Sequence, residues 1–385
     1  MKQVLIVGWY GTETIGDRAI LASLIMQFSK CRKDTLFSIV SIYPFLTSHT
    51  LYEDAGFISR ISGICEDVIK NIKVYDGRNP KSINKAIKLC DYVVMGGGPF
   101  DDMMTMFMVE YIFIVAKHHN LPIMLYGCGI NPLKVKKYIK SAKNIIEMAN
   151  VVILRDEYSC KLCKQIVGNT NTDIIVAIDP AVFSTTKFIE TYDGGDKIKP
   201  YVAVNLRYFP SIYAMNNAVT SKYVNDKVLH FLKSILPENE EIRFIAMNYF
   251  SVGYDDRDIL NEISHEIDMN TIVENHPLSL EQTMILYKNA KFCIGMRFHA
   301  VLMQTLLNGN NYILNYTDSK IGKIPGFIKQ IEGESFYANR IYNLQDSNQP
   351  NSMIIRNDNF SYNINLVKHY YELYMSKIEE FLCLK

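Results

Sequence analysis

The chain has 385 residues, more than one hydrophobic core usually supports, so its length predicts two domains. Hydrophobic residues make up 48% of the sequence and charged residues 21%, a balance that is typical of folded proteins and excludes a disordered chain. The formal net charge of +1 excludes a global attraction to nucleic acid, so any anionic ligand must be bound by a local cluster of charges.

The eight cysteines are scattered, and the sequence shows neither a secretion signal nor an apolar run long enough to span a bilayer. We therefore expect a cytoplasmic protein, with peripheral association with the inner face of the membrane left open. Cys160 and Cys163 form a CxxC, but no second pair or histidine accompanies them, which favours packing over zinc or redox chemistry. No cluster has metal-ligand spacing, so we expect no metal.

The first half alternates short β-branched runs with helical patterns, which predicts a doubly wound α/β domain with a mainly parallel sheet over residues 1–185. A helix is expected at 17–28. The predicted strands are 4–7, 36–42, 92–95, 123–126, 151–154 and 174–177.

Residues 186–200 have the composition of a linker, and a second Rossmann-like domain is predicted over 201–350. Residues 351–385 are expected to form a closing helix that packs back on the body. Both domains should face a central cleft, where ligands bind at the carboxyl ends of parallel strands. The predicted strands are 201–206, 243–247, 271–273, 291–294 and 312–314, and the predicted helices are 224–236, 255–267, 280–289 and 300–307.

Glycines recur where the strands of the first half end. The loop from Gly8 through Gly11 and Gly16 opens a helix whose N–H groups could meet an anion, while a cap by Asp17 with a turn at Gly16 explains the same residues equally well. Gly96, Gly97 and Gly98 follow one strand, and Gly127 and Gly129 follow the next. Two such clusters favour the floor of a cleft over isolated tight turns.

Charged residues at other strand ends divide into structural and functional candidates. Arg155-Asp156 is interpreted as a structural ion pair, and Asp255-Asp256 as charge at a helix N-terminus, with a substrate role as the minority interpretation. Arg207 follows a strand, and Arg297 and His299 follow another at the start of an apolar helix. Two basic side chains at a helix N-terminus predict an anion site, with a purely structural histidine as the alternative.

These residues form an ordered series that resembles the polysaccharide pyruvyl transferase family. The resemblance spans roughly residues 4 to 325. Thr14 stands where the family usually has Asn, and Phe298 replaces a common Leu, so acceptor identity stays open. The series comprises Gly8-x-x-Gly11, Ile15-Gly16-Asp17, Gly96 to Gly98, Gly127-x-Gly129-Ile130, Arg155-Asp156, Asp179-Pro180, Arg207, Met296-Arg297-x-His299-Ala300, and Asn315-Tyr316 with Lys320.

The resemblance implies a GT-B fold and transfer of a pyruvyl group from phosphoenolpyruvate to two hydroxyls of a sugar, giving a cyclic ketal and phosphate. It places a donor site at Arg207, Arg297, Phe298, His299 and Lys320, with phosphoenolpyruvate as a substrate and no cofactor. Arginine forks suit its carboxylate and phosphate, and His299 suits proton delivery, so Arg207, Arg297 and His299 are the catalytic candidates. The loops holding Gly11, Gly16, Asp17, Gly96, Gly97, Gly98 and Gly129 are assigned to the acceptor, whose link to a lipid is open.

Two other functions stay open. A nucleotide-sugar glycosyltransferase of the same architecture is the first, and Glu274 and Glu281 come close to the paired glutamates of some such enzymes. The second is a non-catalytic module that binds anionic metabolites or glycans. Preference for a sugar nucleotide would identify the former, and binding without turnover the latter.

Overall fold

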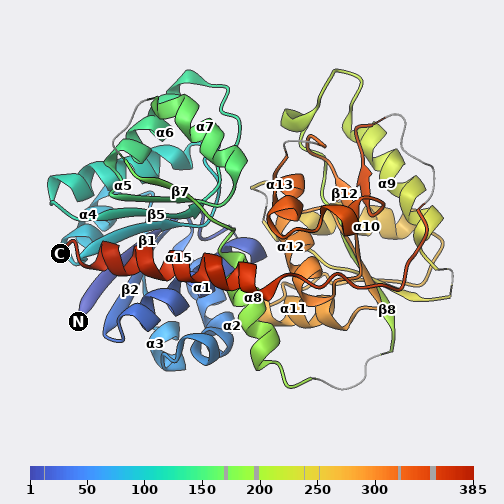
Figure 1. Ribbon diagram of the computed structural model, residues 1–385, viewed down its shortest axis with the longest axis horizontal. Helices are drawn as coiled ribbons and strands as arrows, with labels where there is room; N and C mark the ends of the chain where they lie inside the picture. The colour runs from blue at the N-terminus through green and yellow to red at the C-terminus, as the bar shows by residue number, and fades with distance from the viewer. Residues whose placement is uncertain are drawn as a thin grey trace. The chain divides into compact units, whose positions relative to one another are not determined.

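The computed structural model describes two compact units, each built around one parallel sheet (Figure 1). Unit 1 comprises Met1–Lys187 and Ile364–Lys385, and unit 2 comprises Phe188–Asn363. The described residues are 1–12, 14–168, 172–194, 199–237, 239–250, 252–319, 322–346 and 353–385.

The sheet of unit 1 has the strand order β3-β2-β1-β4-β5-β6-β7, and its strands run parallel. The order reverses between β1 and β4, which makes this pair the topological switch point. The strands are β1 (Lys2–Val7), β2 (Thr35–Ser41), β3 (Lys73–Asp76), β4 (Tyr92–Gly96), β5 (Ile123–Cys128), β6 (Val151–Leu154) and β7 (Ile174–Val176).

The helices of unit 1 follow the strands, and the C-terminal helix α15 (Ile364–Leu382) joins them alongside α1 (Figure 1). Tyr374 and Phe381 of α15 are fully buried, and the Tyr374 hydroxyl donates to the Ile178 carbonyl at 2.8 Å. The others are α1 (Ile15–Cys31), α2 (Pro44–Ser62), α3 (Glu66–Lys70), α4 (Pro80–Lys88), α5 (Thr105–His118), α6 (Lys136–Met148) and α7 (Glu157–Val167). The division between the two units falls within α8 (Ala181–Thr191), after Lys187.

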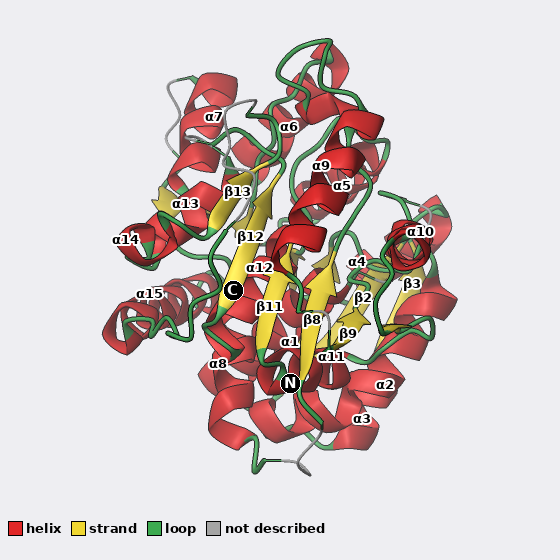
Figure 2. Ribbon diagram, turned by 90° about the vertical axis from the view of Figure 1, so that its right-hand side faces the viewer, coloured by secondary structure: helices red, strands yellow, loops and turns green. Residues whose placement is uncertain are grey.

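The sheet of unit 2 repeats the same plan with the order β10-β9-β8-β11-β12-β13, and its switch point lies between β8 and β11. Figure 2 shows β9, β8, β11, β12 and β13 side by side, and all strands of this sheet run parallel. The strands are β8 (Tyr201–Asn205), β9 (Glu241–Phe244), β10 (Thr271–Val273), β11 (Phe292–Gly295), β12 (Asn311–Asn315) and β13 (Ile341–Asn343).

The helices of unit 2 include α12, which begins directly beyond β11, and α13, which follows β12. Strands β8, β11 and β12 are buried along their whole length, as expected for a parallel sheet covered by helices. The helices are η1 (Ser211–Tyr213), α9 (Ser221–Ile235), α10 (Asp256–Glu266), α11 (Leu280–Asn289), α12 (Phe298–Leu307), α13 (Lys323–Gln330) and α14 (Glu334–Tyr337).

The predicted pair of doubly wound α/β domains and the closing helix are confirmed. The edge strands β3 and β13 escaped prediction, because each is short and only partly buried. Strand β9 occupies Glu241–Phe244 instead of 243–247. Helix α8 runs to Thr191 and so enters the segment 186–200 that was predicted as a linker. The central cleft stays a prediction.

Candidate anion site at the switch point of unit 2

Asn205 ties together the strands that meet at the switch point. It ends β8 and is fully buried, and its Oδ1 accepts a hydrogen bond from the backbone N–H of Arg297 at 3.1 Å. Its Nδ2 donates to the Ile245 carbonyl at 2.9 Å. One amide side chain therefore fixes the carboxyl ends of β8, β9 and β11, where this fold class binds its ligands.

Arg297 is held by a buried carboxylate. It occupies the N-cap position of α12, and its Nε lies 2.7 Å from both carboxylate oxygens of Asp256. Its Nη2 lies 2.6 Å from the Asp256 Oδ1, while Nη1 takes no part in these contacts. Asp256 is 1% exposed, and the backbone N–H groups of Met247 and Asn248 donate to it at 3.0 and 3.2 Å. Arg297 is thus fixed in one orientation.

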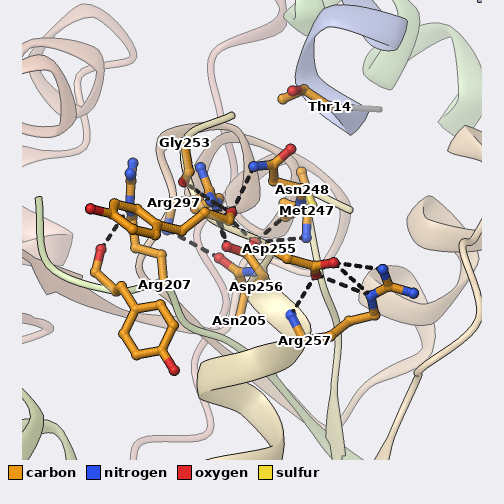
Figure 3. A network of polar contacts seen from close by, with 12 residues as sticks. Thr14, Asn205, Arg207, Met247, Asn248, Gly253, Asp255, Asp256, Arg257 and Arg297 are labelled. Carbon is orange, nitrogen blue, oxygen red and sulfur yellow. Dashed lines mark hydrogen bonds and ion pairs between the residues drawn. The ribbon is translucent and has the colours of Figure 1, made fainter. Parts of the chain in front are cut away.

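The turn after β9 completes this arrangement, as Figure 3 shows. The Nδ2 of Asn248 donates to the carbonyls of Phe250 and Tyr254 at 3.1 and 2.7 Å, which curls the turn around the amide. The Nη2 of Arg297 donates in turn to the carbonyls of Gly253 and Tyr254, each at 3.1 Å. The neighbouring Asp255 faces away toward Arg257, to which it is bound at 2.5 Å.

A second cationic group lies around Tyr316, which follows β12 and is fully buried. The Nη1 of Arg207 donates to the Tyr316 hydroxyl at 3.3 Å, and its guanidinium lies 5.2 Å from the centre of the ring. The Nζ of Lys323 lies 5.9 Å from the same ring centre. Cations from the ends of β8 and the start of α13 thus share one aromatic side chain.

The positive charge of this cluster acts on the hydroxyl of Tyr316. Burial acts to raise the pKa of its hydroxyl, but Lys323, Arg207 and Arg297 outweigh burial and lower the pKa from 10.0 to about 8. Burial also lowers the pKa of Arg297, against the opposing pull of Asp256. The three cations face one buried carboxylate, so the site carries surplus positive charge suited to an anion.

Two helices begin at this cluster with a basic residue in a position that does not stabilise a helix start. Arg297 occupies the N-cap of α12 and makes no side-chain cap hydrogen bond, although Ser, Thr, Asp and Asn are preferred there. Lys323 is the first residue of α13, where the helix dipole disfavours a cation. Both helix starts are thus arranged to add positive potential instead of cancelling it.

The remaining predicted donor residues lie on the first turn of α12 or outside the described residues. His299 is its second residue, and its ring packs edge-on against Phe298 with 5.1 Å between centroids. Phe298 also packs against Phe327 of α13 at 6.0 Å. Lys320 lies outside the described residues.

The structure brings Arg207 and Arg297 to one site together with residues that sequence reasoning missed. Asn205 and Lys323 were not named, Tyr316 belonged to the family series but was given no role at the site, and Asp256 was interpreted mainly as charge at a helix start. Its spacing offered a signal, because Asp256 lies three and four residues before Ile259 and Leu260 and so falls on the apolar face of α10, and buried carboxylates are nearly always paired.

In unit 1, close packing accounts for the glycines at the strand ends. A Cβ on Gly98 would lie 1.3 Å from the Trp9 side chain, and a Cβ on Gly129 would lie 2.5 Å from Arg155 Nε. Near the switch point, Trp9 donates from its ring nitrogen to the Pro99 carbonyl at 3.1 Å. These glycines admit neighbouring side chains, and their assignment to an acceptor stays a prediction.

The start of α1 differs from the predicted cap. Thr14 is the N-cap and α1 begins at Ile15, so Gly16 and Asp17 lie inside the first turn. Asp17 is 8% exposed, and a Cβ on Gly97 would lie 3.3 Å from its Oδ1. An acidic residue in a first turn still favours the helix through the dipole.

The predicted structural ion pair is confirmed. Arg155 lies 3.5 Å from Asp156 and 3.1 Å from Asp179, and all three side chains are buried. The packing role of Cys160 and Cys163 is also supported, since both are buried in α7.

Across the described ranges, no group of three His, Cys, Asp or Glu side chains could hold a metal ion. No helix in those ranges has the length and hydropathy to span a membrane.

Two Rossmann-like units, each built on a parallel sheet, define a GT-B-like fold. The chain belongs to the polysaccharide pyruvyl transferase family, whose sequence model matches residues 15–318. A comparison with curated protein sequences finds no match.

Solved structures with low sequence identity share the fold. The UDP-GlcNAc 2-epimerase from Methanocaldococcus jannaschii has a TM-score of 0.51 at 12% identity, covering 82% of this chain and 83% of that chain. The UDP-GlcNAc 2-epimerase from Neisseria meningitidis, bound to UDP-GlcNAc, has a TM-score of 0.51 at 10% identity, covering 99% and 100%. The S. aureus MnaA-UDP structure has a TM-score of 0.54 at 11% identity, covering 89% and 84%.

Proposed function

We propose that this polysaccharide pyruvyl transferase takes its pyruvyl group from phosphoenolpyruvate and forms a cyclic ketal on two hydroxyls of a sugar, with release of phosphate. The observation that carries the proposal is the convergence of Arg207, Arg297 and Lys323 at the switch point of unit 2, with the buried Asp256 as their carboxylate partner. A small ligand with a carboxylate and a phosphate matches this surplus of positive charge.

The two arginines suit different parts of such a donor. Asp256 occupies Nε and Nη2 of Arg297, which leaves Nη1 for one anionic group of the ligand. Arg207 is anchored through Nε to the Tyr208 carbonyl at 3.2 Å and through Nη1 to Tyr316. Because both guanidinium groups are fixed before the ligand arrives, binding costs little side-chain entropy.

His299 is the proposed general acid. A sugar hydroxyl attacks C2 of phosphoenolpyruvate while His299 delivers a proton to the methylene carbon, which becomes a methyl group. The phosphate then leaves with the C–O electron pair, and Arg297 and Arg207 stabilise its growing charge. The second hydroxyl closes the ring at C2. Of the two hydroxyl protons, one replaces the proton that His299 gave, and the other leaves with phosphate or solvent.

Ligand-induced stabilisation tests the donor without any acceptor. A ligand at 100 times its dissociation constant stabilises the folded state by about 2.7 kcal/mol, so phosphoenolpyruvate should raise the melting temperature of the wild type. Arg297→Ala should abolish this rise. Arg257→Ala is the matched control, because Arg257 lies on the same α10 turn as Asp256 but pairs with Asp255. A rise with sugar nucleotides alone would replace this proposal with the glycosyltransferase.

The His299→Gln variant separates binding from chemistry. It should bind phosphoenolpyruvate with nearly unchanged affinity and lose about 100- to 10,000-fold in turnover with a sugar acceptor. Turnover close to that of the wild type would exclude His299 as the acid. Tight binding of phosphoenolpyruvate by a wild type that turns over with no sugar or glycan would instead favour a non-catalytic binding module.

A further inference from the structure

Tyr316 is the residue on which the cations of the anion site converge. It follows β12, at the same edge of the sheet as the ends of β8 and β11, and its side chain is fully buried. Its hydroxyl accepts a hydrogen bond from Arg207 Nη1 at 3.3 Å, and the Arg207 guanidinium also lies against its ring. The direction in which Arg207 points therefore depends on Tyr316.

The backbone and ring of Tyr316 are fixed from two further elements. The Nε2 of Gln345 donates to the Tyr316 carbonyl at 2.7 Å and to the Tyr213 carbonyl at 2.9 Å. The Tyr213 ring, at the end of η1, packs edge-on against the Tyr316 ring with 5.5 Å between centroids. The Nζ of Lys323 lies 5.7 Å from the Tyr213 ring and 5.9 Å from the Tyr316 ring. The hydroxyl, the backbone carbonyl and the ring of Tyr316 are thus each held by a different residue.

We propose that Tyr316 is a positioning residue of the donor site, which orients Arg207 and whose ionisation sets how much positive charge the site offers to an anion. The inference rests on the proposed function only for the identity of that anion. A buried phenol held among cations by hydrogen bonding and ring contacts can become a phenolate there without losing its partners.

The charges around Tyr316 fix the sign of the effect. Arg207, Lys323 and Arg297 are the cations that act on it, and Asp256 pairs with Arg297 behind them. Because these cations lower the pKa of Tyr316 to about 8, we expect a neutral phenol near pH 7, where the surplus of positive charge is complete. Above about pH 8 the phenolate cancels one positive charge, so an anion must bind less tightly.

Sulfate is the first probe, because its own charge stays constant across the pH range of the experiment. We expect the dissociation constant of sulfate from the wild type to increase about tenfold or more between about pH 7 and about pH 9.5. In Tyr316→Phe the increase should be less than about threefold. Tyr342→Phe is the matched control, since burial raises the pKa of Tyr342, and it should behave like the wild type.

Proton uptake gives a readout that a purely structural role would not move. Because a bound anion favours the neutral phenol, binding at about pH 9 should take up a proton in the wild type but not in Tyr316→Phe. Calorimetry in two buffers of different ionisation enthalpy measures the number of protons taken up for each anion bound. Lys323→Gln provides a second variant: with one cation removed, the pH at which sulfate binding weakens should move upward.

The same titrations with phosphoenolpyruvate separate this inference from the proposed function. Sulfate binding that loses its pH dependence in Tyr316→Phe, without any phosphoenolpyruvate binding, would support the role of Tyr316 and refute the proposed donor. An equal loss of affinity with pH in the wild type and in Tyr316→Phe would refute the role of Tyr316. So would a wild type whose affinity does not change with pH.

Discussion

At the scale of single residues, the buried contact between Asp256 and Arg297 is the feature on which the geometry of the anion site depends. Asp256 accepts two backbone N–H groups and three guanidinium contacts, so its charge is fully compensated. Removing one partner of a buried pair leaves the other charge uncompensated, which costs more than the pair itself contributes.

Adjacent aspartates make that cost measurable. We expect Asp256→Asn to lower the free energy of unfolding by about 3 kcal/mol, because Arg297 is left buried without its carboxylate. Asp255→Asn should cost about 1 kcal/mol or less, since asparagine can still cap α10 and only the partly exposed ion pair with Arg257 is lost. Urea denaturation of both variants gives the comparison. Equal losses would show that the Asp256 contact carries no special weight.

Gly98 offers a second test at this scale, because Gly63 has the same φ of 77° and nothing within 4 Å of the position of a Cβ. Gly63→Ala should cost about 1 kcal/mol through backbone strain alone. Gly98→Ala should cost about 3 kcal/mol or more, because the methyl group would overlap the Trp9 ring. Thermal unfolding measures both values, and similar melting temperatures would contradict the packing account of Gly98.

At the scale of elements, the starts of α12 and α13 favour anion binding over helix stability. Lys323 stands at the first position of α13, where it opposes the helix dipole, while Lys329 in the last turn of the same helix complements that dipole.

Charge reversal at the two ends of α13 should therefore have opposite effects. Lys323→Glu should raise the free energy of unfolding by about 0.5 kcal/mol and abolish anion binding. Lys329→Glu should lower the free energy of unfolding by a similar amount and leave binding intact. Denaturation and sulfate titration check both variants. Retained sulfate binding in Lys323→Glu would remove Lys323 from the site.

The helices and strands also show which parts of the fold can be predicted from the sequence. Helix α11 has the predicted bounds, because its apolar spacing and its Ser279 capping box are local signals. The edge strands β3 and β13 lack the continuous apolar run of a central strand. Arg207 and Arg297 were found from their position at strand ends. Their partners were not, because Asp256 lies 41 residues from Arg297 and Tyr316 lies 109 residues from Arg207.

At the scale of the whole molecule, each unit has its own sheet and core, and the C-terminal helix α15 belongs to unit 1. Phe381 of α15 packs against Phe28 of α1 and Tyr92 of β4, with ring centroids 6.4 and 5.3 Å apart. The core of unit 1 therefore includes side chains from both parts of its discontinuous sequence.

Because α15 is part of the core of unit 1, a mutation that weakens its packing should destabilise unit 1 and leave unit 2 unchanged. Phe381→Ala should destabilise unit 1 by about 3 to 5 kcal/mol through the cavity that it leaves. Amide hydrogen exchange should then speed up in β1, β4 and α1 and stay unchanged in β8, β11 and β12. Phe336→Ala, in unit 2, is the reciprocal control. Faster exchange in both units of the Phe381 variant would contradict independent cores.

The discontinuous build of unit 1 also sets an order of events during synthesis. The ribosome makes α15 only after it has made all of unit 2, so unit 2 can complete its core while unit 1 still lacks a helix. Until α15 is made, Phe28 and Tyr92 lack the Phe381 ring that packs against them in the folded unit. Of these two units, unit 1 therefore begins synthesis first and completes its core last.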